Sequence, residues 1–160
     1  MSFHYYASFK GQKQGQLKGE SSKSKGTDKW VPVLSFKMST ETPVDQATGK
    51  PKGARTHRPL VITKEEDSSS PQLLNAHWNN EVLTEVVVQK EFHGHITQRI
   101  TLTNATISQL GRAFRPHLSG ENSEHDTDLL EQYSFTFAAI KVENVAGSTS
   151  TSDDWAANNK

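Results

Sequence analysis

A pair of histidines is the most obvious candidate for chemistry in this chain of 160 residues. His93 and His95 flank Gly94 in a segment typical of a turn, and their imidazoles could bind one metal ion together. A zinc site needs three or four ligands, and the sequence does not place a third ligand beside this pair. The chain has no cysteine, which excludes thiolate ligands and disulfides. We therefore predict an exposed turn and no metal site.

Motifs of nucleophilic catalysis and nucleotide binding are absent from the sequence. The chain contains no G-x-S-x-G elbow, no Walker A phosphate loop and no G-x-G-x-x-G dinucleotide loop. Serine, histidine and aspartate are plentiful, so counting alone leaves a hydrolytic triad open. His77 falls in a predicted helix beside Leu73 and Trp78, where packing explains it better than proton transfer. We predict a protein that is not an enzyme, with no catalytic residues and no cofactor.

Length and charge narrow the class of protein further. The length favours a single domain over residues 1–160. The 18 basic and 18 acidic residues balance, which argues against nucleic-acid binding. No run of apolar residues is long enough to span a membrane. The first residues show neither the basic region nor the apolar region of a signal peptide. We expect no membrane insertion, and any export would use a route without a signal peptide.

The segment 42–59 is a long loop between two strand-like runs. Its prolines at positions 43, 51 and 59 fix φ and remove amide donors, which rules out a helix or a central strand. Loops of this length inside compact domains are uncommon and are usually functional or disordered. A projecting, mostly basic loop without catalytic pairs suggests contact with another protein. The residues expected to make that contact are Pro43, Asp45, Lys50, Lys52, Arg55, His57 and Arg58.

Alternation of apolar and polar residues predicts most of the remaining elements as strands. They fall near residues 3–10, 30–38, 60–63, 83–92, 96–110 and 133–140. Gly94 marks a hairpin, and the phase change before Ala105 predicts a bulge near Asn104. The polar segments 11–28 and 111–128 are interpreted as loops. The fold class is mainly β: an antiparallel two-sheet, partly closed barrel.

One short helix is predicted over residues 71–79, flanking the sheet. Ser70 is the expected cap and Pro71 suits the first helical position. Leu74 and Trp78 lie one turn apart, as do Leu73 and His77, and these pairs are expected to form the face that packs on the sheet. Asn79 and Asn80 should end the helix, because asparagine tolerates the left-handed conformation.

Two further groups of residues are candidates for contacts outside the core. The strand 96–110 carries a polar face opposite its apolar one, and this face is expected to meet water; its residues are Thr97, Arg99, Thr101 and Thr103. The tail 146–160 is rich in serine and threonine and is expected to be flexible. Within the tail, Asp153, Asp154 and Trp155 form a candidate docking group, because leaving a tryptophan ring in water is costly.

Three segments resemble the hemolysin-coregulated proteins (Hcp), the tube proteins of bacterial type VI secretion systems. They are Thr42–Leu60, the strand Thr101-Leu-Thr-Asn-Ala-Thr-Ile107, and the stretch Val145-Ala-Gly-Ser-Thr-Ser-Thr-Ser-Asp-Asp-Trp155. Their order and spacing agree across nearly the whole chain. The segments 11–28 and 112–128 are where the chain departs most from other members.

The resemblance implies a homohexameric ring that stacks into a hollow tube. A contractile sheath would propel the tube, topped by a spike protein (VgrG), out of the bacterial cytoplasm, and small effector proteins would travel inside the ring. Residues 42–59 would carry the ring-to-ring contact, with their four cations meeting acids of the next ring, so deleting Val44–His57 should spare rings and abolish tubes. The alternatives are a phage-type tail-tube protein and a secreted ligand-binding β-sandwich module.

Overall fold

The computed structural model describes residues 4–20, 30–114 and 129–155 as strands, turns and one helix. In chain order the elements are β1 (His4–Gly11), β2 (Gly15–Gln16), β3 (Val31–Val33), β4 (Ser35–Lys37), β5 (Thr40–Glu41), β6 (Thr56–His57), β7 (Leu60–Glu65), α1 (Ser70–Trp78), β8 (Leu83–Phe92), β9 (His95–Phe114), β10 (Leu129–Asn144) and β11 (Thr149–Asp154).

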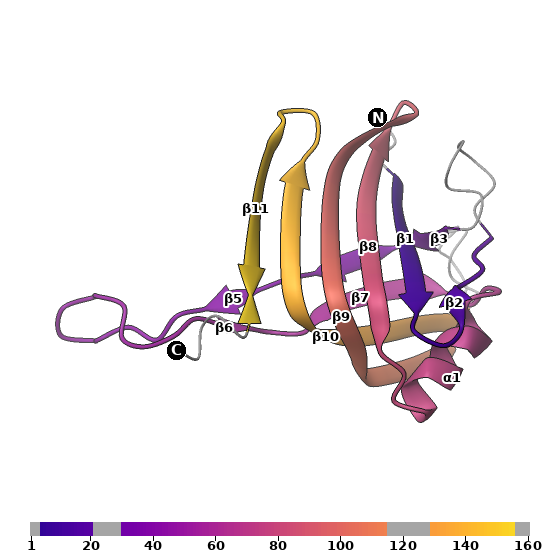
Figure 1. The fold of residues 1–160 in the computed structure, drawn as a ribbon, viewed down its shortest axis with the longest axis horizontal. Coiled ribbons are helices and arrows are strands. Elements are labelled where there is room, and N and C mark those ends of the chain that lie inside the picture. The colour runs from indigo at the N-terminus through magenta and orange to yellow at the C-terminus, as the bar shows by residue number, and fades with distance from the viewer. Residues whose placement is uncertain (1–3, 21–29, 115–128, 156–160) are drawn as a thin grey trace, which may run out of the picture.

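Nine of these strands form one antiparallel sheet that curls on itself (Figure 1). The order is β2-β1-β8-β9-β10-β7-β4, with β3 also paired to β1 and β11 also paired to β10. Strands β5 and β6 form a separate small ladder. The predicted mainly-β, antiparallel, partly closed barrel with one flanking helix and a long loop is confirmed.

The two ends of the curled sheet are joined by the chain itself. The segment 30–38 was predicted as one strand, but it breaks at Leu34 into β3 and β4. Strand β3 pairs with β1 at one end of the sheet, and β4 pairs with β7 at the other. The Leu34 amide donates to the carbonyl of Thr63 at 2.9 Å across this seam. Pro32, which has no amide donor, lies in β3 beside the break.

The core fills the inner face of the curl, because alternate residues of the long strands point into it. Its members include Phe9, Val86, Leu102 and Phe135, all fully or almost fully buried. The rings of Phe9 and Phe135 stack with centroids 5.7 Å apart. Burial of each such side chain contributes about 1.5–3 kcal/mol, which makes this layer the main source of stability.

The hairpin between β8 and β9 lies at Gly94, as predicted, and its turn consists of two residues, His93 and Gly94. His93 and Gly94 both have positive φ, 50° and 80°, which is the backbone of a type I′ turn. Glycine is favoured in such a turn because its missing Cβ removes the steric cost of positive φ. The turn chemistry in the sequence therefore placed this hairpin correctly.

The irregularity of β9 takes a different form from the predicted bulge. Asn104 has φ 50° and leaves Thr103 and Asn104 both exposed, which shifts the apolar phase before Ala105. The register against β8 and β10 continues unchanged across Asn104. The register shift against β10 comes later, where Ser134 faces Gln109 and Phe135 faces Ile107. The bulge therefore lies at Ser108, four residues beyond its predicted place.

Helix α1 confirms the predicted element, but not its cap, and it confirms its packing face only in part. Ser69, not Ser70, occupies the cap position, and it makes no side-chain capping bond. Leu73 and Ala76 are buried, whereas Trp78 is 74% exposed. Of the predicted packing face, Leu73 is therefore buried and His77 is half-buried, with its Nδ1 3.1 Å from the carbonyl oxygen of Ile107, whereas Trp78 does not pack on the sheet. Asn79 and Asn80 end it, with Asn80 at φ 52°, as predicted.

Three segments predicted to lack regular structure contain strands. The segment 11–28 holds β2 and Leu17, which is 1% exposed and whose amide donates to the carbonyl of Phe9; its residues 21–28 lie outside the described part. The segment 111–128 begins with the last residues of β9, and residues 115–128 are not described. The tail forms β11, which pairs with β10 over six residues, because the edge of β10 is open there.

Candidate functional site

The arm, defined as residues 42–59, projects to one side of the barrel from beside the end of β11 (Figure 1). Its own backbone bonds shape it into a narrow hairpin. Asp45 and Lys50 bond across the tip at 2.9 Å, and the Lys52 amide donates to the carbonyl of Pro43 at 2.6 Å. Gly49 has φ 69°, which suits a glycine at the turn. The arm thus has a defined shape without any core of its own.

The cations of the arm fall into two groups. Arg58 forms an ion pair with Glu41 at 2.8 Å at the base of the arm, and Arg55 is paired with Asp153. Lys50 and Lys52 lie near the tip and are exposed. The prediction treated the four cations alike, but the structure assigns two of them to acids of their own chain.

At the arm root, Asp153 receives two side chains from the arm. Arg55 Nε donates to Asp153 Oδ2 at 2.6 Å, and Arg55 Nη2 donates to Oδ1. His57 Nε2 donates to the same Oδ2 at 2.6 Å. These hydrogen bonds, first that from Arg55 and then that from His57, hold the pKa of Asp153 well below its ordinary value.

An aromatic contact completes this arm-root cluster, which consists of Arg55, His57, Phe137, Asp153 and Trp155. The His57 ring lies 5.5 Å from the ring of Phe137 and 5.7 Å from that of Trp155. Phe137 and Trp155 meet edge to face at 6.3 Å. The side chain of His57 is only 7% exposed. The ring of Trp155, a residue that is 36% exposed, therefore lies against two rings of its own chain.

The predicted polar face of β9 lies on the side of the sheet away from the core. Thr101 and Thr103 stand opposite Lys141 and Ala139 of β10. Arg99 faces Glu143 and lies 3.5 Å from its carboxylate. Thr97 differs, because it sits at a register shift in the β8–β9 ladder and its carbonyl accepts the amide of Val145. Three of the four predicted residues thus share one continuous polar face.

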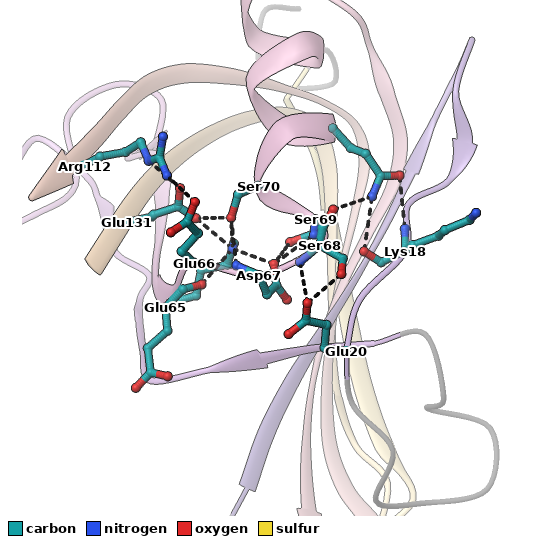
Figure 2. Close-up of polar contacts among 12 residues, drawn as sticks. Lys18, Glu20, Glu65, Glu66, Asp67, Ser68, Ser69, Ser70, Arg112 and Glu131 are labelled. Carbon is teal, nitrogen blue, oxygen red and sulfur yellow. Dashed lines mark hydrogen bonds and ion pairs between the residues drawn. The ribbon is translucent and has the colours of Figure 1, made fainter. Parts of the chain in front are cut away.

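A buried polar cluster, which the sequence analysis missed, lies between α1 and the barrel (Figure 2). Lys64 of β7 is 0% exposed, and its Nζ lies within 3.0 Å of Glu131 Oε1, Asp67 Oδ1 and Ser70 Oγ. Ser70 Oγ also donates to Glu131 Oε1 at 2.5 Å. Arg112 approaches Glu131 Oε2 at 2.8 Å. Arg112 also pairs with Glu66 at 2.9 Å, so the ion pairs of this cluster join two cations to three carboxylates.

The pKa values of Glu131 and Tyr133 both depend on their neighbours in this cluster. Burial acts to raise the pKa of Glu131, but hydrogen bonds from Lys64 and Ser70 and the charge of Lys64 outweigh it and hold that pKa below its ordinary value. Burial, with the adjacent Glu131 charge, strongly raises the pKa of Tyr133. The carboxylate is thus held as an anion inside the protein.

The start of α1 is also tied from its outer side. Ser68 donates its amide and its hydroxyl to Glu20 Oε1, at 3.1 and 2.6 Å (Figure 2). Gln72 exchanges two hydrogen bonds of 3.2 Å with the backbone of Lys18. The helix is therefore clamped between a buried network and the segment that follows β2.

Other features of the described residues offer less to a functional argument. A pocket of about 240 Å³ opens on the core side of the sheet, lined by Tyr5, Phe36, Val88 and Val142 among others. In the described ranges no three metal-ligating side chains come together, and no helix has the length and apolar character to cross a membrane.

Known proteins resemble this chain over nearly its whole length. The family model of the type VI secretion system effector Hcp matches residues 6–143. The major exported protein of Pseudomonas aeruginosa is 31% identical over 166 residues, covering 94% of each chain. A crystal structure of an Hcp protein has a TM-score of 0.84 at 26% identity, covering 96% of this chain and 98% of that one. The secreted protein Hcp3 from Pseudomonas aeruginosa has a TM-score of 0.72 at 28% identity, covering 96% and 99%.

Proposed function

This chain belongs to the Hcp family of the type VI secretion system, and we propose that it is a structural subunit whose rings of six copies stack into a tube. The proposal treats residues 1–160 as a single tube domain without catalytic function. The curled sheet with a polar outer face and a projecting arm supports it, because such a subunit offers one surface to a wet channel and another to a neighbour. The relative from Pseudomonas aeruginosa is named a major exported protein, which supports the same role.

The projecting arm is the observation that carries the proposal. It is held in shape by its own backbone bonds and contributes little to the core. Val44 is 56% exposed and the tip cations Lys50 and Lys52 face solvent, so the surface is available to a second copy of the chain. Since Arg55 and Arg58 are paired within their own chain, we assign the direct ring-to-ring charges to Lys50 and Lys52.

The polar sheet face would line the channel of the ring. Thr101, Thr103 and Arg99 lie on it beside Lys141 and Glu143, and this mixture of small hydroxyls and paired charges suits a hydrated wall. We propose that small effector proteins pass or are held there. The spike protein and the contractile sheath would be the partners at the tube end and around its outside, and the subunit would wait in the cytoplasm before export.

Replacement of the arm tests this proposal. In the variant, Val44–Ala54 gives way to two glycines, which spares the buried His57 that a deletion of Val44–His57 would remove. We expect negative-stain micrographs to show rings with a central opening and no tubes, and export by a type VI system to fail. Tubes of normal length from this variant, or wild-type protein that stays monomeric when crowded, would refute the proposal.

A further inference from the structure

The arm has a defined shape, but its own bonds do not set its direction. At the base, β5 and β6 pair through two residue pairs, Thr40 with His57 and Glu41 with Thr56. A two-stranded ladder of this length is marginal in water. The bonds near the tip, such as that between Asp45 and Lys50, join the arm to itself. Some other contact must keep the arm at a fixed angle to the barrel.

The C-terminal strand supplies such a contact from a rigid support. Strand β11 pairs with β10 in continuous register from Thr149 to Asp154, so Asp153 is fixed to the sheet opposite Ile140. Its carboxylate holds the planar fork of Arg55 and the ring nitrogen of His57. Arginine and carboxylate bonded in this two-point fashion fix an orientation as well as a distance.

The contact between the arm root and the C-terminal strand lies at a particular place along β10. Strand β7 pairs with β10 at residues 130–135, and β11 pairs with it at residues 139–144. Between these two ladders lies Phe137, whose ring meets those of His57 and Trp155. The root of the arm therefore lies at the gap between the two ladders, where the ring of His57 contacts those of Phe137 and Trp155. His57 is buried there although it belongs to the exposed arm.

We propose that Asp153 and Trp155 are positioning residues for ring stacking, which set the direction in which the arm leaves the barrel. Neither residue lies in the arm. The inference rests on the proposed stacking role of the arm, and it makes the last strand of one subunit a condition for the contact with a second copy of the chain in the next ring. Loss of this contact would leave folded rings whose arms sample many directions.

Spin labels measure the direction of the arm itself. The chain lacks cysteine, so Thr48→Cys at the arm tip and Glu85→Cys on β8 give two labels on one chain, diluted into unlabelled protein. We expect a narrow distance distribution that widens by about twofold or more in Asp153→Ala and Asp153→Asn, because one arm direction is replaced by many. Ser152→Ala, at an exposed position of the same strand β11, is the control and should keep the narrow distribution. A distribution that stays narrow in both Asp153 variants would overturn the inference.

A covalent bridge separates positioning from direct charge contact. Arg55→Cys/Asp153→Cys is treated either with a bismaleimide, which joins the two positions, or with a monofunctional maleimide, which blocks them. We expect the blocked protein to form rings but to reduce the amount of sedimenting tube at least about tenfold, because a small loss of affinity at each arm multiplies over the many arms of a ring. The bridged protein should form tubes again. Tubes in both forms, or in neither, would contradict the positioning role.

The outcomes keep this inference distinct from the proposed function. If the protein with a shortened arm still forms tubes, stacking by the arm is wrong. If the shortened arm abolishes tubes while both Asp153 variants stack and keep a narrow distance distribution, the stacking role stands and the positioning role is refuted.

Discussion

The arm-root cluster and the buried polar cluster use similar chemistry in opposite surroundings. In each, a carboxylate is held by basic side chains and hydrogen-bond donors: Asp153 by Arg55 and His57, and Glu131 by Lys64, Arg112 and Ser70. The side chains of Lys64 and Glu131 are 0% exposed, whereas those of Arg55 and Asp153 are 45% and 21% exposed. Water can replace the partners at the arm root and cannot do so beneath α1.

This difference in exposure gives the two clusters different roles: the buried polar cluster stabilises the fold, and the arm-root cluster orients the arm. A buried ion pair, once formed, is expensive to break because its members lose water and gain nothing in exchange. An exposed pair changes stability little but still restricts geometry. We therefore expect damage to the buried polar cluster to unfold the barrel and damage to the arm-root cluster to disturb assembly.

Removal of Lys64 should have the largest effect. Lys64→Met removes the fully buried one of the two cations that lie 2.8 Å from Glu131, and it also takes the lysine from Asp67, so we expect a loss of about 3–5 kcal/mol in the free energy of unfolding. Urea denaturation followed by circular dichroism measures it. The double variant Lys64→Met/Glu131→Met removes the buried ion pair and leaves Arg112 paired with Glu66, so it should recover part of the loss, while Asp67 still lacks its lysine. A single variant as stable as wild type would show that the buried polar cluster contributes nothing.

Acid should weaken the barrel through Glu131. Its pKa in the folded protein is lower than in the unfolded chain, so its stabilising contribution is complete above the unfolded pKa of about 4.3. The contribution is lost as the pH falls through the lower, folded pKa. Urea midpoints between pH 7 and pH 3 should fall less steeply in Glu131→Gln than in wild type. Equal slopes in the two proteins would place the acid sensitivity elsewhere.

Asp153→Asn should leave the barrel nearly as stable as before. The side chain lies at the surface, and water can take the place of its lost ionic contacts, so we expect a change below about 1 kcal/mol. The same urea experiment measures it beside Lys64→Met. A loss as large as that of the lysine variant would mean that the two clusters are equivalent parts of the fold.

The sequence predicted the elements whose signals are local. Alternation along β8, β9 and β10 and the turn at His93 and Gly94 need only neighbouring residues. The joint at Leu34 escaped prediction, because it depends on which strands close the curl. The predicted cap at Ser70 failed for a similar reason: its hydroxyl is taken by Lys64 and Glu131, which come from two other strands.

The two clusters differ in how far the sequence could reveal them. Lys64 continues the buried phase of Leu60 and Ile62, and Glu131 that of Tyr133 and Phe135, so a charge in an apolar series was a usable signal. The partners at the arm root are 98 residues apart and lie in polar segments, where no periodicity points from one to the other. The sequence singled out both segments as candidates for contacts, but it did not predict that they meet.

Salt should affect tubes modestly and the barrel hardly at all. The Debye length falls from about 10 Å at 0.1 M salt to about 3 Å at 1 M, which screens exposed charges far more than buried ones. Light scattering should show fewer tubes as salt rises, with a weaker dependence in Lys50→Gln/Lys52→Gln. The matched control, Lys10→Gln/Lys37→Gln, removes two exposed lysines outside the arm and should keep the wild-type slope. If both double variants respond to salt as wild type does, the tip cations carry no charge contact and the arm must stack through its backbone and apolar atoms such as those of Val44.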